Sequence, residues 1–229
     1  TGITWSNSLN VAQMLDKSSY SISLGNTHQD GIISSTGMDR YNVKVSADTK
    51  LTNNWSSGFT ANYITTSIDK AVTSGNGLLR TVYAAPPSYD LAGIPSHVDG
   101  NPYTQNSFRG SFDNAYWAME NNKFTEDTNR FFGNVYASYQ TDFGTTNHKL
   151  NAKYMVGVDA YTTHYVDSYG YGSNTGGGRG QIENYGWTNA TYNSLLTINY
   201  DWHINEDWGL NAVVGNEIIQ SNRKKYYEY

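Results

Sequence analysis

The stretch from His148 to Ala160, His-Lys-Leu-Asn-Ala-Lys-Tyr-Met-Val-Gly-Val-Asp-Ala, alternates apolar and polar residues along almost its whole length. Successive side chains of a β-strand point to opposite faces, so a period of two predicts a strand with one apolar and one polar face. The even-numbered positions from Leu150 to Ala160 form the apolar set, whereas Lys153 and Asp159 belong to the polar set. The stretch is therefore expected to be a β-strand between two different environments.

The same alternation recurs along the chain, whereas helical periodicity is absent, so we expect an all-β fold. Lys44 and Asp48 lie in polar registers like Lys153 and Asp159, and no Asp, Glu, Lys or Arg lies in an apolar register. A soluble β-sandwich also alternates, so alternation alone leaves two architectures open. The expected strands cover residues 20–24, 41–51, 55–65, 131–143, 148–160, 192–204 and 208–218, with a weaker strand over 9–14.

The expected connections alternate between short and long without exception. Outer-membrane barrels have short turns on the periplasmic side and long loops on the extracellular side. Bulky rings also gather near both ends of the strands, as in the aromatic girdles of such barrels. These two features favour a transmembrane barrel over a sandwich. The short turns cover 16–17, 52–54, 144–147 and 205–207, and the long loops cover 31–39, about 69–128 and about 166–190.

Composition excludes several classes of protein. The 229 residues carry 20 Asp and Glu against 15 Lys and Arg, a net charge of -5 that argues against a nucleic-acid binder. The chain has no cysteine, which removes disulfides, thiol catalysis and cysteine-ligated zinc. No apolar run is long enough for a membrane-spanning helix, and a mean hydropathy of -0.62 is also compatible with alternating barrel strands.

Several short motifs follow one another in order along the chain. They are Ser19-Tyr-Ser-Ile-Ser-Leu-Gly25, Gln29-Asp-Gly-Ile-Ile33, Arg40-Tyr-Asn-Val43, Lys50-Leu-Thr52 with Trp55, Asn101-Pro-Tyr103, Tyr116-Trp117, Asn121-Asn122 and Asn129-Arg-Phe-Phe-Gly-Asn134. Taken together, these motifs resemble the SusC/RagA-like TonB-dependent transporters of Bacteroidota outer membranes. The resemblance covers most of residues 20–139, and residues 150–229 fit by strand pattern only.

The resemblance implies an antiparallel up-and-down transmembrane β-barrel, of which residues 1–229 would supply about seven or eight strands out of roughly 22. It implies a bacterial outer-membrane importer of oligosaccharides or peptides, with outer-membrane lipid, a SusD-like lipoprotein and the TonB complex as partners. A plug domain, through which TonB would act, is expected to be absent from these residues. The segment alone is then not expected to transport.

Two alternatives stay open at this point. One is a secreted or surface β-sandwich that binds glycans through loop aromatics and folds without detergent. The other is a complete small outer-membrane barrel with a structural or adhesive role, which requires the first and last strands to pair.

No catalytic or metal-binding pattern stands out, so the chain is not expected to be an enzyme or to hold a cofactor. The five histidines never fall at a metal-binding spacing, and the glycine-rich residues 170–180 lack the signatures of phosphate-binding loops. We expect that glycine-rich stretch to be a flexible extracellular loop tip.

The candidate recognition residues are aromatics in the longest loop with polar neighbours. Tyr and Trp rings stack on sugars or clasp peptide side chains, while Asn and Arg donate hydrogen bonds. The alternative is that these rings pack the loop against itself or against a partner lipoprotein. The candidates are Tyr103, Arg109, Tyr116, Trp117 and Asn121.

Overall fold

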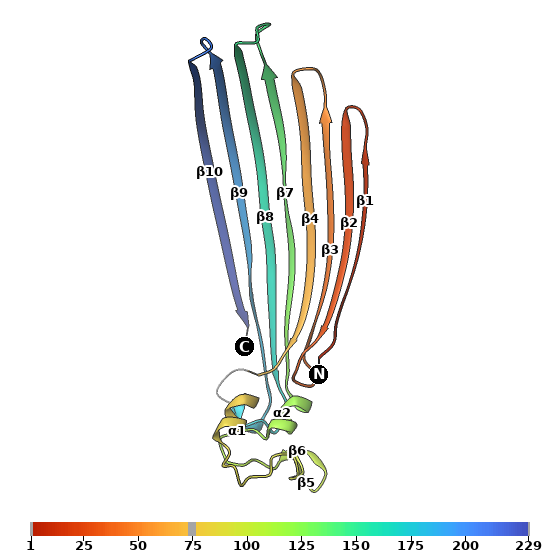
Figure 1. Ribbon diagram of the computed structural model, residues 1–229. Coiled ribbons are helices and arrows are strands. Elements are labelled where there is room, and N and C mark those ends of the chain that lie inside the picture. Colours follow the sequence, from red (N-terminus) through yellow and green to blue (C-terminus); the bar gives the residue numbers. More distant parts are fainter. Residues whose placement is uncertain (1, 73–76, 229) are drawn as a thin grey trace.

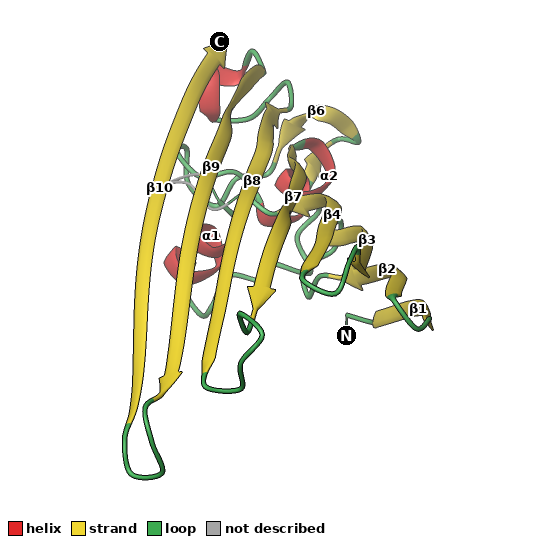
Figure 2. Ribbon diagram, turned by 90° about the horizontal axis from the view of Figure 1, so that it is seen from above, coloured by secondary structure: helices red, strands yellow, loops and turns green. Residues whose placement is uncertain are grey.

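The computed structural model describes residues 2–72 and 77–228. Its main feature is one 8-stranded antiparallel sheet in which consecutive strands are neighbours, in the order β1-β2-β3-β4-β7-β8-β9-β10 (Figure 1). The sheet is curved across its width (Figure 2). The strands are β1 (Thr4–Met14), β2 (Ser18–Asp30), β3 (Gly37–Lys50), β4 (Trp55–Lys70), β7 (Lys123–Thr141), β8 (His148–Tyr169), β9 (Gln181–His203) and β10 (Gly209–Glu228).

The remaining elements lie beyond one end of the sheet, opposite the short turns (Figure 1). They are the helices α1 (Leu78–Ala84) and α2 (Ala115–Asn121), the two-stranded sheet of β5 (His97–Val98) and β6 (Asn101–Gln105), and the 3-10 helix η1 (Thr175–Gly178). Neither α1 nor α2, the α-helices of the described residues, is long and apolar enough to cross a membrane. The sequence did not predict these short helices.

Strand pairing places every expected apolar register on one side of the sheet, here called the apolar face. Directly opposed residues in adjacent strands point to the same face of the sheet. A row of paired residues that runs from strand to strand therefore lies on one side of the sheet. On the opposite side, the polar face, one row runs through Lys44, Asn62, Phe132, Asp159, Thr191 and Ser221. On the apolar face one row runs through Tyr20, Ala47, Phe59, Val135, Val156, Ser194 and Ile218.

The apolar face carries charge only near its loop-side end. One row there runs through Asn26, Tyr41, Thr65, Asn129, Thr162, Thr188 and Lys224. We call the part of the apolar face between this row and the short turns the apolar belt. In the described strands no Asp, Glu, Lys or Arg lies in the belt. Such segregation is what a lipid-facing surface requires, because a charge in hydrocarbon is costly.

Most large side chains of the apolar belt are exposed, including Ile22, Val43, Phe59, Val135 and Val156. Large contiguous apolar surfaces are rare on soluble monomers and mark contact with a membrane or a partner. In the described residues no second sheet packs on the main sheet, as a β-sandwich requires. All buried apolar residues that the structure describes belong instead to the loop side of the molecule: Val72, Phe112, Ala115, Trp117, Ala118 and Phe124.

The strands extend further toward the loops than the sequence predicted. Strand β7 begins at Lys123, β8 ends at Tyr169 and β9 begins at Gln181, so the expected loops 69–128 and 166–190 shrink to 71–122 and 170–180. The connection between β2 and β3 shrinks from 31–39 to 31–36 and is no longer than the turn 142–147. The prediction that short and long connections strictly alternate was therefore wrong for the connection between β2 and β3. The weak first strand is present and complete.

The sheet is open. Strands β1 and β10 are its two edges, and the described residues of one do not pair with those of the other. A complete small barrel requires that pairing, so the structure does not support this alternative. An open, curved, up-and-down sheet is compatible with a segment of a larger barrel wall.

Candidate functional site

The two longest loops fold together into one compact unit, here called the cap. It comprises the described parts of residues 71–122 together with residues 170–180 (Figure 1). Trp117 on α2 is fully buried in it, and its indole Nε1 donates to the carbonyl oxygen of Pro102 at 2.7 Å. Long surface loops that pack around their own side chains present a fixed surface, which is how binding loops are commonly built.

Asp113 joins the two loops of the cap. Its carboxylate is buried and accepts hydrogen bonds from Gln105 Nε2 at 2.9 Å and Ser173 Oγ at 2.6 Å. The backbone N and side-chain Nδ2 of Asn174 donate to the same carboxylate at 2.7 and 2.8 Å. A buried carboxylate that accepts this many hydrogen bonds holds its donors in place. Residues 170–180 are therefore fixed to the longer loop.

Asn114 starts helix α2. Its side-chain oxygen accepts from the backbone N–H groups of Tyr116 and Trp117 at 3.0 and 3.2 Å, which is the usual role of Asn at a helix N-cap. Its own N–H donates to Gln105 Oε1 at 2.6 Å. The start of helix α2 and the end of strand β6 are thus bonded through Asp113 and Asn114.

Four of the five candidate recognition residues fall into two groups. Tyr103 and Tyr116 are 59% and 41% exposed, so their rings are available to a ligand. Trp117 is buried, and Asn121 Nδ2 donates to the carbonyl oxygen of Trp117 at 3.0 Å. Trp117 and Asn121 thus hold the cap together and support the surface rather than form it.

Arg109 lies against the cap's own rings. Its guanidinium carbon is 6.0 Å from the ring centre of Phe108 and 5.8 Å from that of Phe112. Arg80 lies closer to the Phe112 ring, at 4.2 Å. Arginine stacked on aromatic faces still presents N–H donors to solvent, so Arg109 remains a possible ligand contact.

Sequence reasoning missed Tyr171. Its ring meets Tyr103 edge to face, with centroids 5.5 Å apart, and it is exposed like Tyr103. Gly172 makes this approach possible, since it has a φ of +103° and a Cβ there would lie 2.2 Å from the carbonyl oxygen of Tyr103. The glycine-rich stretch, expected to be a flexible tip, packs against the longer loop of the cap instead.

The polar face is lined by paired charges and rings. Arg130 Nε donates to Asp159 Oδ1 at 2.8 Å, and the Tyr136 hydroxyl donates to Asp48 at 2.6 Å. The Lys153 ammonium lies 4.2 Å from the centre of the Tyr136 ring. Of the polar residues singled out in the sequence, Asp48, Lys153 and Asp159 are thus engaged with neighbours on the wall. Ion pairs of this kind contribute little to the free energy of unfolding, so they mainly fix the positions of side chains on the polar face.

Where strands β4, β7, β8 and β9 extend past the apolar belt, the polar face carries a cluster of rings and charges. Tyr165 and Tyr185 stack with centroids 4.9 Å apart, and the Tyr185 hydroxyl donates to Asp167 at 3.1 Å. Lys70 Nζ lies 3.3 Å from Glu126 and 4.3 Å from the Tyr165 ring centre. Burial raises the pKa of Tyr185 to about 12, and the hydrogen bond to Asp167 acts in the same direction. Burial also raises the pKa of Asp167.

We expect Tyr185→Phe to remove the most alkaline part of the tyrosinate absorbance titration. Because the phenol pKa is raised on folding, its stabilising effect is complete below about pH 10 and is lost as the pH rises toward about 12. Tyr171→Phe, which removes the hydroxyl of an exposed tyrosine on the cap, should leave this alkaline component in place. Identical titration curves for the Tyr185→Phe variant and the unmodified protein would contradict the expectation.

In the part of the chain that the structure describes, no group of three or more His, Asp or Glu side chains could hold a metal ion.

No protein-family model and no curated protein sequence matches the chain. Solved structures, by contrast, do match the chain. The chain is similar to the RagAB peptide importer in its "closed-closed" state, with a TM-score of 0.72 and 12% identity, and in its "open-open" state, with 0.73 and 13%. A further structure of the RagAB peptide transporter matches with a TM-score of 0.67 and 13% identity.

The similarity covers 96–99% of this chain but only 25–26% of each importer chain. The chain therefore spans about a quarter of the length of these proteins, and identity at this level shows a shared fold alone. The matched structures are described as a peptide importer or a peptide transporter. Together with the open sheet, this shared fold supports a segment of a β-barrel wall.

Proposed function

We propose that the chain forms part of the wall of an outer-membrane nutrient importer of the SusC-like, TonB-dependent class. The observation that carries the proposal is the apolar face. Apolar registers found independently in separate segments meet on one exposed face, and no charge enters the belt in the described strands. The fold similarity to peptide importers supports the same conclusion.

In this proposal the apolar belt faces outer-membrane lipid and the polar face lines the lumen. The short turns lie on the periplasmic side and the cap on the extracellular side. Strands β7 to β10 continue past the belt, so they would project above the bilayer and carry the cap. TonB would act on the importer through a plug inside the barrel of roughly 22 strands.

The proposed cargo is a peptide or an oligosaccharide, received at the mouth with the help of a SusD-like lipoprotein. The exposed rings of Tyr103, Tyr116 and Tyr171 would contact cargo or partner, with Arg109 as a hydrogen-bond donor. Trp117 and Asn121 would act indirectly, by fixing the cap. Aromatic surfaces of this kind serve peptides and sugars alike, so the choice between them is left to experiment.

The test is uptake by bacterial cells that carry the importer. We expect fluorescently labelled oligopeptides or oligosaccharides to accumulate, and accumulation to stop when the proton-motive force is dissipated. Removing both exposed rings by Tyr103→Ala and Tyr171→Ala should slow uptake by roughly tenfold, since stacked aromatic contacts contribute about 0.5–1.5 kcal/mol each. Tyr83→Ala, which removes an exposed ring from helix α1 of the cap, is the control. Uptake that is independent of the proton-motive force would contradict an importer of this class.

A further inference from the structure

Aromatic rings on the polar face are confined to one half of the sheet. In the described strands, the polar face of β1 to β4 carries no Phe, Tyr or Trp. Six rings on the polar face of β7, β8 and β9, by contrast, follow one another along the strands, and we call them the aromatic track. They are Tyr185, Tyr165, Trp187, Tyr161, Phe132 and Tyr136.

The aromatic track runs from the cap end of the sheet toward the middle of the wall. Tyr165 pairs with Glu126 of β7, and the last ring, Tyr136, lies ten residues further along β7. At a rise of about 3.3 Å per residue, the track is about 33 Å long. Its first rings stand beyond the apolar belt, whereas Tyr136 follows Val135, which lies in the belt on the other face. In the proposed importer, the track would lead from the mouth into the lumen.

The position of these rings calls for an explanation, because the inner face of a barrel wall is normally polar. All six side chains of the track are partly exposed, and in the described residues no second sheet packs on the main sheet to cover them. A contiguous patch of exposed apolar surface marks contact with another molecule. The track is therefore a candidate contact surface that is separate from the exposed rings of the cap.

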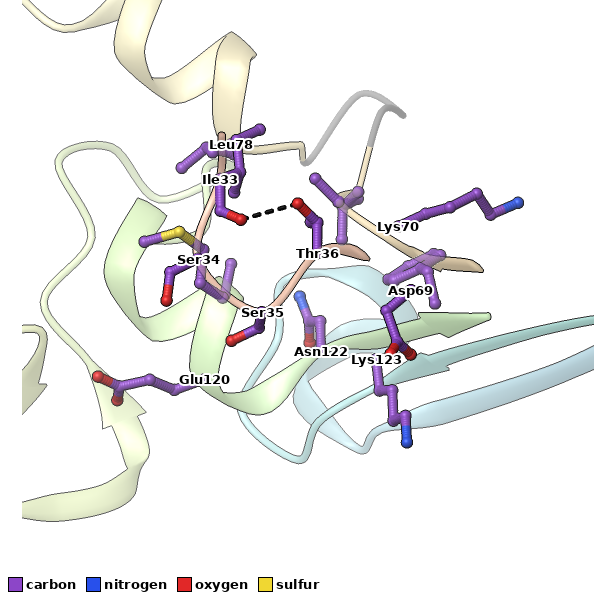
Figure 3. A pocket seen from close by; sticks show the side chains of 15 residues that line it. Ile33, Ser34, Ser35, Thr36, Asp69, Lys70, Leu78, Glu120, Asn122 and Lys123 are labelled. Carbon is purple, nitrogen blue, oxygen red and sulfur yellow. Dashed lines mark hydrogen bonds between the residues drawn. The ribbon is translucent and has the colours of Figure 1, made fainter. Parts of the chain in front are cut away.

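Basic side chains lie against the cap end of the track. The Lys70 ammonium is 4.3 Å from the centre of the Tyr165 ring. Figure 3 shows the Lys70 side chain at the end of β4, pointing away from the connection 31–36. The guanidinium carbon of Arg223 is 4.8 Å from the ring centre of Trp187. Cations at these distances are attracted to the ring faces.

The same arrangement continues toward the middle of the wall. The guanidinium carbon of Arg130 is 5.0 Å from the ring centre of Phe132 and 5.9 Å from that of Tyr161. The Lys153 ammonium is 4.2 Å from the centre of the Tyr136 ring. Lys153 is exposed and forms no ion pair with a carboxylate in the part of the chain that the structure describes. The track thus combines rings with hydrogen-bond donors along its whole length.

The ring faces of the track indicate which class of cargo fits. A sugar stacks on an open ring face, but Tyr165 already stacks on Tyr185, with centroids 4.9 Å apart, and the cations lie against Trp187, Phe132 and Tyr136. The ring edges, which carry partial positive charge, and the basic donors remain for contact. Both attract hydrogen-bond acceptors, and a peptide backbone offers one carbonyl oxygen per residue.

We infer that the aromatic track binds peptide cargo as it passes through the lumen, with the ring edges and Lys153 in contact with the carbonyl oxygens of the peptide. The track would be a second contact surface, reached after the exposed rings of the cap. The inference rests on the proposed function, because the polar face lines a lumen only in that proposal.

Cross-linking during uptake tests the inference in cells that carry the full-length importer, with a single introduced cysteine. Asn134→Cys lies in β7 between Phe132 and Tyr136, and Ser21→Cys lies in the same row of the polar face, three strands away on β2. The probe is an oligopeptide of alanine and glutamine with one thiopyridyl-activated cysteine. The thiolate of the importer attacks the activated sulfur, a disulfide to the peptide forms, and thiopyridone leaves.

We expect the peptide to react with Asn134→Cys at least about tenfold faster than with Ser21→Cys, since stacked or edge contacts with rings contribute about 0.5–1.5 kcal/mol each. Each rate is divided by the rate for thiopyridyl-activated cysteine alone, which corrects for access to the thiol. Removing two rings of the track by Phe132→Ala and Tyr161→Ala should abolish the preference. Ser46→Ala with Thr60→Ala, on the same face but off the track, is the matched control and should preserve it.

Equal corrected rates at the two cysteines, or a preference that survives the loss of both rings, would overturn the inference. An excess of unlabelled peptide should suppress the reaction at Asn134→Cys, and equal suppression by a maltooligosaccharide would refute the assignment to peptides. If the rings packed on a plug instead, removing them would speed the reaction of Asn134→Cys with activated cysteine in the absence of peptide, which would also overturn the inference.

Uptake measured in the same cells separates the two proposals. Uptake that depends on the proton-motive force but shows no preference for Asn134→Cys contradicts the inference about the track alone. A clear preference in cells whose uptake is independent of the proton-motive force contradicts the importer class alone.

Discussion

Val156→Lys and Ile198→Lys are each expected to impair assembly into the outer membrane severely. Val156 and Ile198 lie in the apolar belt, where no charged side chain occurs in the described strands. A lysine near the middle of the bilayer on the lipid face of a barrel costs about 2–4 kcal/mol. Assembled barrels migrate differently on electrophoresis before and after heating. We expect the heat-modifiable band to fall strongly in both variants.

Neighbouring positions on the polar face provide the controls. Asn151→Lys, five residues from Val156 in β8, and Thr197→Lys, next to Ile198 in β9, place the same charge on the side that already carries Lys153 and Asp159. These variants should assemble like the unmodified protein. If lysines on both faces reduced the heat-modifiable band equally, the assignment of the apolar face to lipid would be refuted.

Asp113→Ala is expected to unfold the cap while the sheet stays assembled. The substitution leaves four buried or part-buried donors on Gln105, Ser173 and Asn174 without their acceptor. Each buried group that loses its partner costs about 1–3 kcal/mol, so the total should be about 3 kcal/mol or more even where water enters. Limited trypsin digestion should then cut the cap at Arg80, Arg109 or Arg179.

Glu120→Ala tests whether this effect is specific, because Glu120 is a mostly exposed carboxylate of the same cap. It should leave the cap resistant to trypsin. A cap that resists digestion equally in Asp113→Ala would show that the buried network does not hold the two loops together.

The middle of each strand could be predicted from the sequence because one face there is apolar and the other polar. That contrast disappears toward the loops. Residues 125–130 of β7, Thr-Glu-Asp-Thr-Asn-Arg, are polar on both faces, yet their backbone groups pair with β4 and β8 as well as those further along. Strand pairing depends on backbone hydrogen bonds and does not require apolar and polar side chains to alternate. The sequence therefore underestimated the length of every strand that reaches the cap. Phe143 was placed in a strand for its apolar side chain but lies in a turn with a φ of +55°.

The candidate site was only partly visible in the sequence. Loop aromatics could be selected by type, but type alone does not separate the exposed Tyr103 from the buried Trp117. Helices α1 and α2 span about two turns each, too short for a helical period to be detected. Asp113 was one loop carboxylate among several, and its role depends on Ser173 and Asn174, which lie 60 and 61 residues further along the chain. Asn114 directly before α2 was the one local signal, as a typical N-cap residue.

The most direct test of the central claim is labelling of single cysteines in the outer membrane. The chain has no cysteine of its own, so each introduced thiol reports one site. We predict that a fluorophore on Val135→Cys or Val156→Cys is quenched by nitroxide-bearing lipids and protected from water-soluble quenchers. The same fluorophore on Asn134→Cys or Asn151→Cys, on the polar face, should show the opposite pattern. If adjacent positions were equally accessible to water and none to lipid, the sheet would not be part of a membrane barrel.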